Sequence, residues 1–181
     1  MNRILLFLVF ALFCQYTLQA QVISIENARA LPAGSVVTVR GIVTNGAELG
    51  KIRYLQDGTA GIAAYPGTGS MAGFETNVSI GDSIEVTGPT TVFQSLLEIT
   101  PITSYVVISS ANTVPAPVEI AVPEISGDLE GQLVRLPCVT FNNGGGTFSA
   151  SGTYTFTDFD GNSAAIYLRS NHPLLGLPIP A

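Results

Sequence analysis

Two Asp-Gly pairs, each set between short apolar runs, constrain this chain more than any other feature of its sequence. Asp57-Gly58 separates residues 52–56 from residues 60–65, and Asp160-Gly161 lies inside the apolar stretch 154–168. An Asp-Gly pair in this setting predicts a β-hairpin, because glycine accepts the positive φ angle that a tight turn requires. We therefore predict one hairpin at each pair.

Each predicted hairpin follows a β-rich segment that begins at a glycine. Residues 34–40 precede the first hairpin and residues 131–136 precede the second. The composition agrees with strands, since 46% of the residues are hydrophobic and only 11% are charged, with 19 Gly and 11 Pro. Such a composition is typical of short strands joined by turns, not of amphipathic helices. We interpret the chain as one β module used twice.

The first module is predicted to be an all-β, five-stranded Greek-key barrel, the OB-fold. Its first three strands form a meander, and Gly41 inside the first strand indicates a bulge or a sharp bend. Ser24 is expected to cap a short helix over residues 25–30, while the glycine-rich connection 66–80 is expected to be a poor helix. The predicted strands cover residues 36–44, 52–56, 60–65, 83–87 and 92–99, with residues 105–108 as an extension of the last.

The second module resembles the first only as far as its third strand. Residues 133–141 repeat the first strand, and residues 154–168 repeat the hairpin. Because an open three-stranded sheet leaves apolar side chains uncovered, we expect the sequence to be a truncated piece of a longer protein. The alternative is that the first module supplies the missing cover. The predicted parts are a signal peptide (1–20), an OB-fold module (21–112), a linker and lead-in (113–130) and a truncated OB-like module (131–181).

The first twenty residues predict export. A basic start at Arg3 precedes an apolar run over residues 4–14, and the segment ends on the small residue Ala20. This pattern is that of a secretory signal peptide, and the run is too short to span a bilayer comfortably. The chain has 7 basic and 13 acidic residues, so loss of Arg3 leaves 6 against 13, a net charge of −7. An acidic chain is unfavourable for holding a phosphate backbone.

The motif series GSVVTVRGIVTN, YLQDGTAGIAAY, IGDSIEVTG and LLEIT resembles the OB-fold modules of secreted bacterial proteins. These modules are common in Bacteroidetes and are often attached to extracellular nucleases and phosphoesterases. The later segment LEGQLVRLPCVTF is similar to the opening strand of the same family. The resemblance implies a secreted, non-catalytic accessory or binding module of a larger exported protein. The alternatives are the nucleic-acid-binding part of an extracellular nuclease or phosphoesterase, and a carbohydrate-binding module.

The expected partners are an oligonucleotide or oligosaccharide and the remainder of a longer chain. OB-folds commonly bind such polymers on the face of their second and third strands, where aromatic rings stack with bases and cations contact phosphates. Neighbouring residues on a strand point to opposite faces, so Arg53 and Tyr54 cannot both line this face. Core packing is the alternative role for the aromatic residues. The candidate ligand contacts are Arg53, Tyr65, Phe93, Tyr167 and Arg169.

Other motifs point to turns and packing. Residues 158–162 look like a calcium loop, but Gly161 is fourth instead of sixth and the twelfth position is Arg169 instead of an acid. His172, the only histidine, is expected on a loop, and Cys138 is expected to be a buried thiol on a strand. We therefore predict no catalytic residue, metal or cofactor within this sequence.

Overall fold

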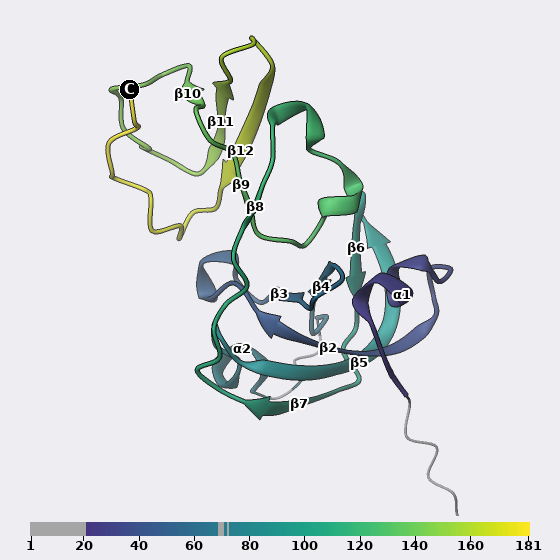
Figure 1. Ribbon diagram of the computed structural model, residues 1–181. Coiled ribbons are helices and arrows are strands. Elements are labelled where there is room, and N and C mark those ends of the chain that lie inside the picture. The colour runs from purple at the N-terminus through teal and green to yellow at the C-terminus, as the bar shows by residue number, and fades with distance from the viewer. Residues whose placement is uncertain (1–20, 69–70, 72) are drawn as a thin grey trace, which may run out of the picture.

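The computed structural model describes residues 21–68, 71 and 73–181, so the predicted signal peptide lies outside the described residues. The first half of the chain forms a closed barrel (Figure 1). Its strands are β2 (Val36–Val43), β3 (Arg53–Gln56), β4 (Gly61–Ala64), β5 (Ser83–Phe93) and β6 (Leu96–Ile99).

The pairing of these strands gives the OB-fold topology. β2, β3 and β4 form an antiparallel meander, β4 pairs with β6 in parallel, and β6 pairs antiparallel with β5. The first part of β5 then pairs with β2 from Val36↔Pro89 to Ile42↔Ser83, which closes the barrel. The all-β barrel predicted from the sequence is therefore confirmed, as is the Asp57-Gly58 hairpin between β3 and β4.

Gly41 lies inside an unbroken β2 and not at a bulge. It is the residue before Ile42, where β2 begins to pair with β3. A Cβ atom on Gly41 would lie 3.1 Å from the Cβ of Leu55 on β3. The glycine therefore allows β3 to approach the barrel strand closely at this point.

The interior of the barrel is apolar. Burying a valine, leucine, isoleucine or phenylalanine side chain contributes about 1.5–3 kcal/mol. The apolar cluster inside the barrel therefore supplies most of the driving force for its closure. Its fully buried members come from all five barrel strands and from both helices. They include Ile25, Val39, Val43, Leu55, Ile62, Phe74, Ile84, Val86 and Ile99.

Two short helices cover the barrel. In α1 (Ile25–Ala30) the Ser24 hydroxyl accepts a hydrogen bond from the Asn27 N–H at 3.2 Å, as predicted. The helix α2 (Phe74–Asn77) lies in the connection that was expected to be a poor helix. Only this one turn is helical among the described residues of the connection, which agrees with that expectation; it is stabilised by Phe74, which is fully buried and packs edge-on against the Tyr105 ring with their centroids 5.2 Å apart. Tertiary packing thus outweighs weak local propensity here.

The strand predicted over residues 92–99 is a hairpin. β5 continues through Pro89 to Phe93, turns at Gln94 and Ser95, and returns as β6. Gln94 and Ser95 both have positive φ angles, 48° and 70°, although neither is a glycine. The following strand β7 (Ser104–Ser109) pairs with β5 and does not extend β6.

A second sheet contains β10 (Thr140–Phe141), β11 (Gly152–Thr157) and β12 (Ser163–Leu168). The antiparallel pairing of β11 with β12 confirms the second predicted hairpin. The single strand predicted over residues 133–141 is wrong, because Pro137 lacks an N–H and Cys138 has a φ of 55°. Cys138 is also exposed and lies outside the strands, which contradicts its predicted burial.

The remaining elements are short and lie mostly between the barrel and the second sheet (Figure 1). The 3-10 helix η1 lies in the loop between β2 and β3, and β8 pairs in parallel with β9. Their bounds are β1 (Val22–Ile23), η1 (Ala47–Leu49), β8 (Val118–Glu119), η2 (Val122–Glu124), η3 (Gly127–Leu129) and β9 (Val134–Arg135).

The second sheet has its own apolar cluster, centred on Phe148, Leu168 and Ile179. Phe148 and residues 174–179 come from loops and pack against the inner side of the sheet. The cover of this face is thus supplied by loops of the same part of the chain. We call residues 140–181, which hold the second sheet and these loops, the second unit. The predicted boundaries between the modules stay predictions. Within the described residues no helix is both long and apolar enough to cross a lipid bilayer.

Candidate ligand-binding faces

The outer face of β3 and β4 is the place where an OB-fold usually takes its ligand. Leu55, Ile62 and Ala64 point into the barrel core, so alternation turns Tyr54, Gln56 and Ala63 outward. Tyr54 pairs with Ala63, and Ala63 pairs with Glu98 of β6. Three neighbouring strands therefore present Tyr54, Ala63 and Glu98 in one row.

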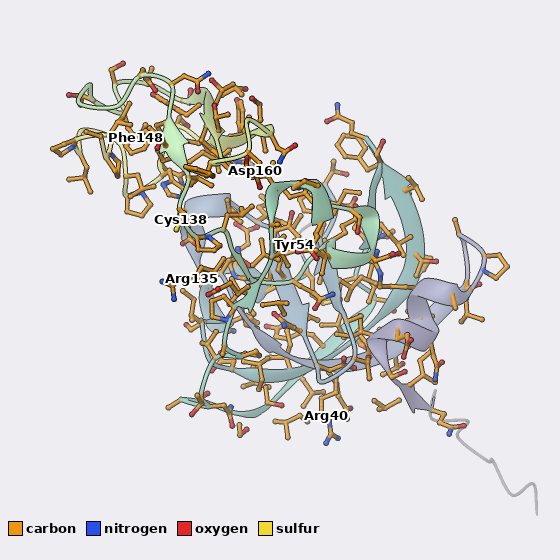
Figure 2. The ribbon with its side chains drawn as sticks, turned by 45° about the horizontal axis from the view of Figure 1, so that its top comes forward. Arg40, Tyr54, Arg135, Cys138, Phe148 and Asp160 are labelled. Atoms are coloured by element: carbon orange, nitrogen blue, oxygen red, sulfur yellow. The ribbon has the colours of Figure 1, made fainter. Side chains whose placement is uncertain are left out.

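This outer face is covered by residues 127–133, which are the end of the predicted linker and the three residues that follow it. From here on, the name lead-in segment refers to residues 127–133 only. The Leu133 N–H donates to Gln56 Oε1 at 3.1 Å, and the Leu97 N–H donates to Glu130 Oε2 at 3.1 Å. Ala63 is 0% exposed, although its side chain points away from the barrel core. Figure 2 shows Tyr54 beside this segment. The face is therefore filled by the chain itself.

An ion pair holds the lead-in segment to α1. Arg29 Nη1 lies 3.3 Å from Glu130 Oε2, and Arg29 Nη2 donates to the Gly127 carbonyl at 2.8 Å. The same guanidinium donates to the Gly61 carbonyl of β4 at 3.1 Å. Arg29 thus links the helix, the barrel and the segment. Because its guanidinium is paired with Glu130, it is not free to pair with an anionic ligand.

The covered face carries negative charge. Burial raises the pKa of the Tyr54 hydroxyl, and the nearby Glu130 and Glu98 raise it further, while Arg169 opposes them. Burial also raises the pKa of the Glu98 carboxyl, and that residue is only 6% exposed. A phosphate group on this face would meet the carboxyl groups of Glu98 and Glu130, and the nearby cation outside an ion pair, Arg169, comes from the end of β12.

Arg53 does not face a ligand in this structure. It is 2% exposed, and burial lowers the pKa of its guanidinium, although Glu48 and Glu75 counteract the effect. All of its nitrogen atoms donate to backbone carbonyls, so the side chain ties together the loops at one end of the barrel. The acceptors are Gly50 (2.8 Å), Glu75 (2.8 Å), Ile52 (3.0 Å), Gly46 (3.2 Å) and Val78 (3.2 Å).

The other candidates of the first barrel lie apart from one another. Tyr65 is half-buried just after β4, where its N–H donates to the Ile99 carbonyl at 3.0 Å. Phe93 is exposed at the end of β5, opposite Leu96 in the β5–β6 hairpin. The five predicted contacts therefore do not form one cluster, because Tyr167 and Arg169 belong to the second unit.

The corresponding outer face of the second unit is open. Tyr154, Phe156, Ile166 and Leu168 face the inner side of the sheet, so their neighbours face solvent. Across the two strands, Thr153 pairs with Tyr167 and Thr155 pairs with Ala165. We call these four residues the open face; all are exposed, and Tyr167 is 67% exposed.

Arg169 lies where the open face meets the first barrel. Its Nη2 is 3.7 Å from the position that a Cβ on Gly50 would take, and its charge reaches Tyr54. Nearby, Asn171 Nδ2 donates to the Ala47 carbonyl at 2.8 Å. The end of β12 therefore contacts the loop between β2 and β3, and Arg169 is exposed beside it.

Few cations are free to meet an anionic ligand. Arg29, Arg40 and Lys51 pair with Glu130, Glu85 and Glu75. Arg53 is buried, which leaves Arg135 and Arg169 as the basic residues in the described part of the chain that make no ion pair. Figure 2 shows Arg135 pointing outward below Cys138, where the two units meet.

The Asp158 carboxylate stabilises the turn between β11 and β12. The Asp158 carboxylate accepts hydrogen bonds from Asn162 N at 2.8 Å and from Asn162 Nδ2 at 2.9 Å. His172 Nδ1 accepts from the Leu174 N–H at 3.2 Å. Within the described ranges, no three His, Cys, Asp or Glu side chains are grouped closely enough to hold a metal ion.

Comparison with known proteins gives one informative match. No protein-family model matches the chain. Over 159 residues, 82% of this chain, it is 33% identical to Endonuclease YhcR of Bacillus subtilis (strain 168). The chain spans about 13% of the length of that relative. Among solved structures, the hypothetical protein ygiW from E. coli matches with a TM-score of 0.38 and 16% identity, over 50% of this chain and 90% of that chain.

Proposed function

We propose that this protein is a secreted, non-catalytic module that binds nucleic acid for a larger protein of the nuclease type. The observation that carries the proposal is the match to Endonuclease YhcR, in which the aligned part is a small share of a long protein. That part folds here as a closed OB barrel followed by a second sheet. OB barrels suit the binding of polymers, and a module of this kind can hold the substrate that another domain cuts.

The use of the polar side chains supports a binding role over a catalytic one. Asp57 and Asp158 hold hairpin turns through several hydrogen bonds each. His172 accepts a backbone hydrogen bond, and Glu130 is paired with Arg29. These groups stabilise the fold, so the reaction of the parent protein would be carried by other parts of it.

The free cations limit the electrostatic part of the affinity. Each phosphate contact on a single strand lowers log K by about 0.7 per tenfold rise in salt. In the described residues, Arg135 and Arg169 are the exposed cations outside ion pairs. If each contacts one phosphate, the slope of log K against the logarithm of the salt concentration would be about −1.4. Binding would therefore weaken only about sevenfold between 50 and 200 mM salt.

Fluorescence anisotropy tests this function directly. Residues 21–181 are titrated into a labelled 15-nucleotide oligo-dT and into a 15-base-pair duplex at 50 and 200 mM NaCl. We expect saturable binding with the shallow salt dependence given above. Absence of binding to both nucleic acids at 50 mM NaCl would overturn the proposal.

A carbohydrate-binding role is the second candidate, because the exported chain has a net charge of −7 after loss of the leader. The open face also offers two threonine hydroxyls beside the Tyr167 ring, which suits an uncharged sugar. Calorimetric titration with uncharged oligosaccharides distinguishes the two functions. Binding of a sugar that is independent of salt, without binding of oligo-dT, would favour this candidate.

Secretion is part of the proposal and has its own test. The precursor is expressed in a bacterial host, and the exported product is sequenced from its amino end. We expect the product to start at Gln21, directly after the small residue Ala20. Retention of the intact precursor inside the cell would contradict export.

A further inference from the structure

The two units present their outer sheet faces in opposite ways. On the first barrel, the lead-in segment lies over β3 and β4, and Ala63 is completely buried beneath it. On the second unit, the face formed by β11 and β12 is exposed, including Thr153, Thr155 and Tyr167. Only the second face can therefore receive a ligand without rearrangement of the chain.

We propose that the protein binds single-stranded nucleic acid on the open face, with Tyr167 stacking on a base and Arg169 contacting a phosphate. The lead-in segment closes the corresponding face of the first barrel, which then serves to position the second unit. This inference rests on the proposed function and adds the location of the site and the form of the ligand.

The neighbours of Tyr167 leave its ring free to stack. Thr153 lies directly across on β11, and Ala165 precedes it by two residues on the same side of β12. Both side chains are short, so the faces of the ring are accessible. The hydroxyls of Thr153 and Thr155 can each donate and accept a hydrogen bond, which suits base edges and sugar oxygens in an unpaired strand.

Arg169 extends this face toward the first barrel. It follows Tyr167 by two residues and is exposed, and it makes no ion pair among the described residues. Its guanidinium lies near Gly50, at the loop between β2 and β3. A base stacked on Tyr167 would place the adjoining phosphate within the reach of such a long side chain. In a duplex the bases are stacked on each other, so this arrangement selects single strands.

The covered face is closed by specific contacts and by charge. Gly131 of the lead-in segment lies against Gly61 of β4, so their backbones touch. Glu130 is fixed by Arg29 and by the Leu97 N–H. Since Glu98 also lies on this face, a strand that displaced the segment would lose these contacts and meet exposed carboxyl groups.

The test compares variants in the anisotropy assay with oligo-dT. Tyr167→Ala is expected to weaken binding about 5- to 150-fold, the range for loss of one stacking contact. Arg169→Gln is expected to weaken binding and to reduce the salt slope by about 0.7. Phe159→Ala is the matched control, because Phe159 is an aromatic residue of the same unit that is 96% exposed, but lies beside Asp158 and Asp160. Its binding is expected to equal that of the wild type.

A further variant examines the first barrel. Arg29→Gln combined with Glu130→Gln removes the ion pair that holds the lead-in segment, and we expect unchanged affinity. Equal binding by Tyr167→Ala and the wild type, or tighter binding by the double variant, would overturn this inference and leave the proposed function intact. Lack of oligo-dT binding by the wild type, with binding of the duplex, overturns this inference alone, and lack of binding to both nucleic acids overturns the proposed function as well. Circular dichroism and thermal denaturation establish that each variant is folded.

Discussion

Gly61 of β4 and Gly131 of the lead-in segment lie so close together that neither position has room for a side chain. A Cβ on Gly61 would lie 2.2 Å from the carbonyl carbon and oxygen of Gly131, and a Cβ on Gly131 would lie 2.7 Å from the carbonyl carbon of Gly61. Gly131 also has a φ of 79°, a region that favours glycine. The segment therefore docks on the barrel backbone to backbone.

Gly61→Ala is predicted to push the lead-in segment off the barrel. The added methyl group meets backbone atoms, which cannot move aside as a flexible side chain can, so we expect a loss of about 1–3 kcal/mol. Hydrogen exchange of residues 127–133 should rise, and urea denaturation measures the loss of stability. Gly58→Ala is the control, since no atom lies within 4 Å of its Cβ position. If both variants behave alike, the close contact does not exist in solution.

The sequence predicts the parts of the fold that depend on neighbouring residues. The two hairpins are predicted by their Asp-Gly pairs, and α1 is predicted by the cap at Ser24. The positive φ expected of the glycine is found in the second turn, at Gly161 (86°), but not at Gly58, where the Asp57 carboxylate instead accepts hydrogen bonds from the N–H groups of Thr59 and Ala60. The cover of the first outer face could not be predicted, because Gly61 and Gly131 are 70 positions apart in the chain. No local pattern indicates that their backbones meet.

The candidate site shows the same limit. The charge of Arg53 suits a contact with a phosphate, yet alternation with Leu55 already places it on the inner side of β3. Three of the carbonyls that surround it belong to the adjoining loop, at Gly46, Gly50 and Ile52. The other two, at Glu75 and Val78, come from 22 and 25 residues further along the chain, and no local pattern indicates that they meet Arg53. Tyr167 and Arg169 are exposed as the hypothesis requires, and their role in binding stays a prediction.

Arg53→Lys is predicted to destabilise the barrel although it keeps the charge. A lysine ammonium has three donors and no planar fork, so it cannot reach the five carbonyls that Arg53 contacts. Each lost hydrogen bond to a charged group contributes about 1.5–3 kcal/mol, and we expect a total loss at the upper end of this range or above it. Chemical denaturation gives the free energy of unfolding.

Arg40→Lys is the matched control for Arg53→Lys. Arg40 lies on β2 and forms an ion pair with Glu85, but its side chain is exposed. Exposed ion pairs contribute only about 0.2–1 kcal/mol, so this variant should be close to the wild type. Similar losses in the two variants would mean that burial of Arg53 does not determine its contribution.

Asp57→Asn is predicted to reduce stability at neutral pH by about 1–3 kcal/mol, the contribution of hydrogen bonds to a charged group. Burial alone would raise the pKa of the Asp57 carboxyl, but hydrogen bonds from Ile25, Thr59 and Ala60 together lower it. A lowered pKa gives stability that is present above the ordinary value, near 4, and is lost as the pH falls through the folded value. The variant should therefore lose less stability than the wild type on acidification.

The pH dependence of urea denaturation between pH 2 and 7 measures this effect. Asp160→Asn provides the control, because Asp160 is an exposed carboxylate in the turn of the second hairpin. It should follow the wild-type curve. If Asp57→Asn follows that curve as well, the hydrogen bonds to Ile25 and Ala60 do not stabilise the charged carboxylate.

Glu98→Gln is predicted to have the opposite sign and to stabilise the protein at pH 7. Burial raises the pKa of the Glu98 carboxyl, so the fold favours its neutral form. The contribution of Glu98 to the stability of the wild type is then largest below the ordinary glutamate pKa, near 4, and is lost as the pH rises from there through the raised value. Glutamine has no charge to bury, so its advantage should be absent at pH 4 and present at pH 7. A variant that is less stable than the wild type at pH 7 would mean that the charged carboxylate makes a favourable contact under the lead-in segment.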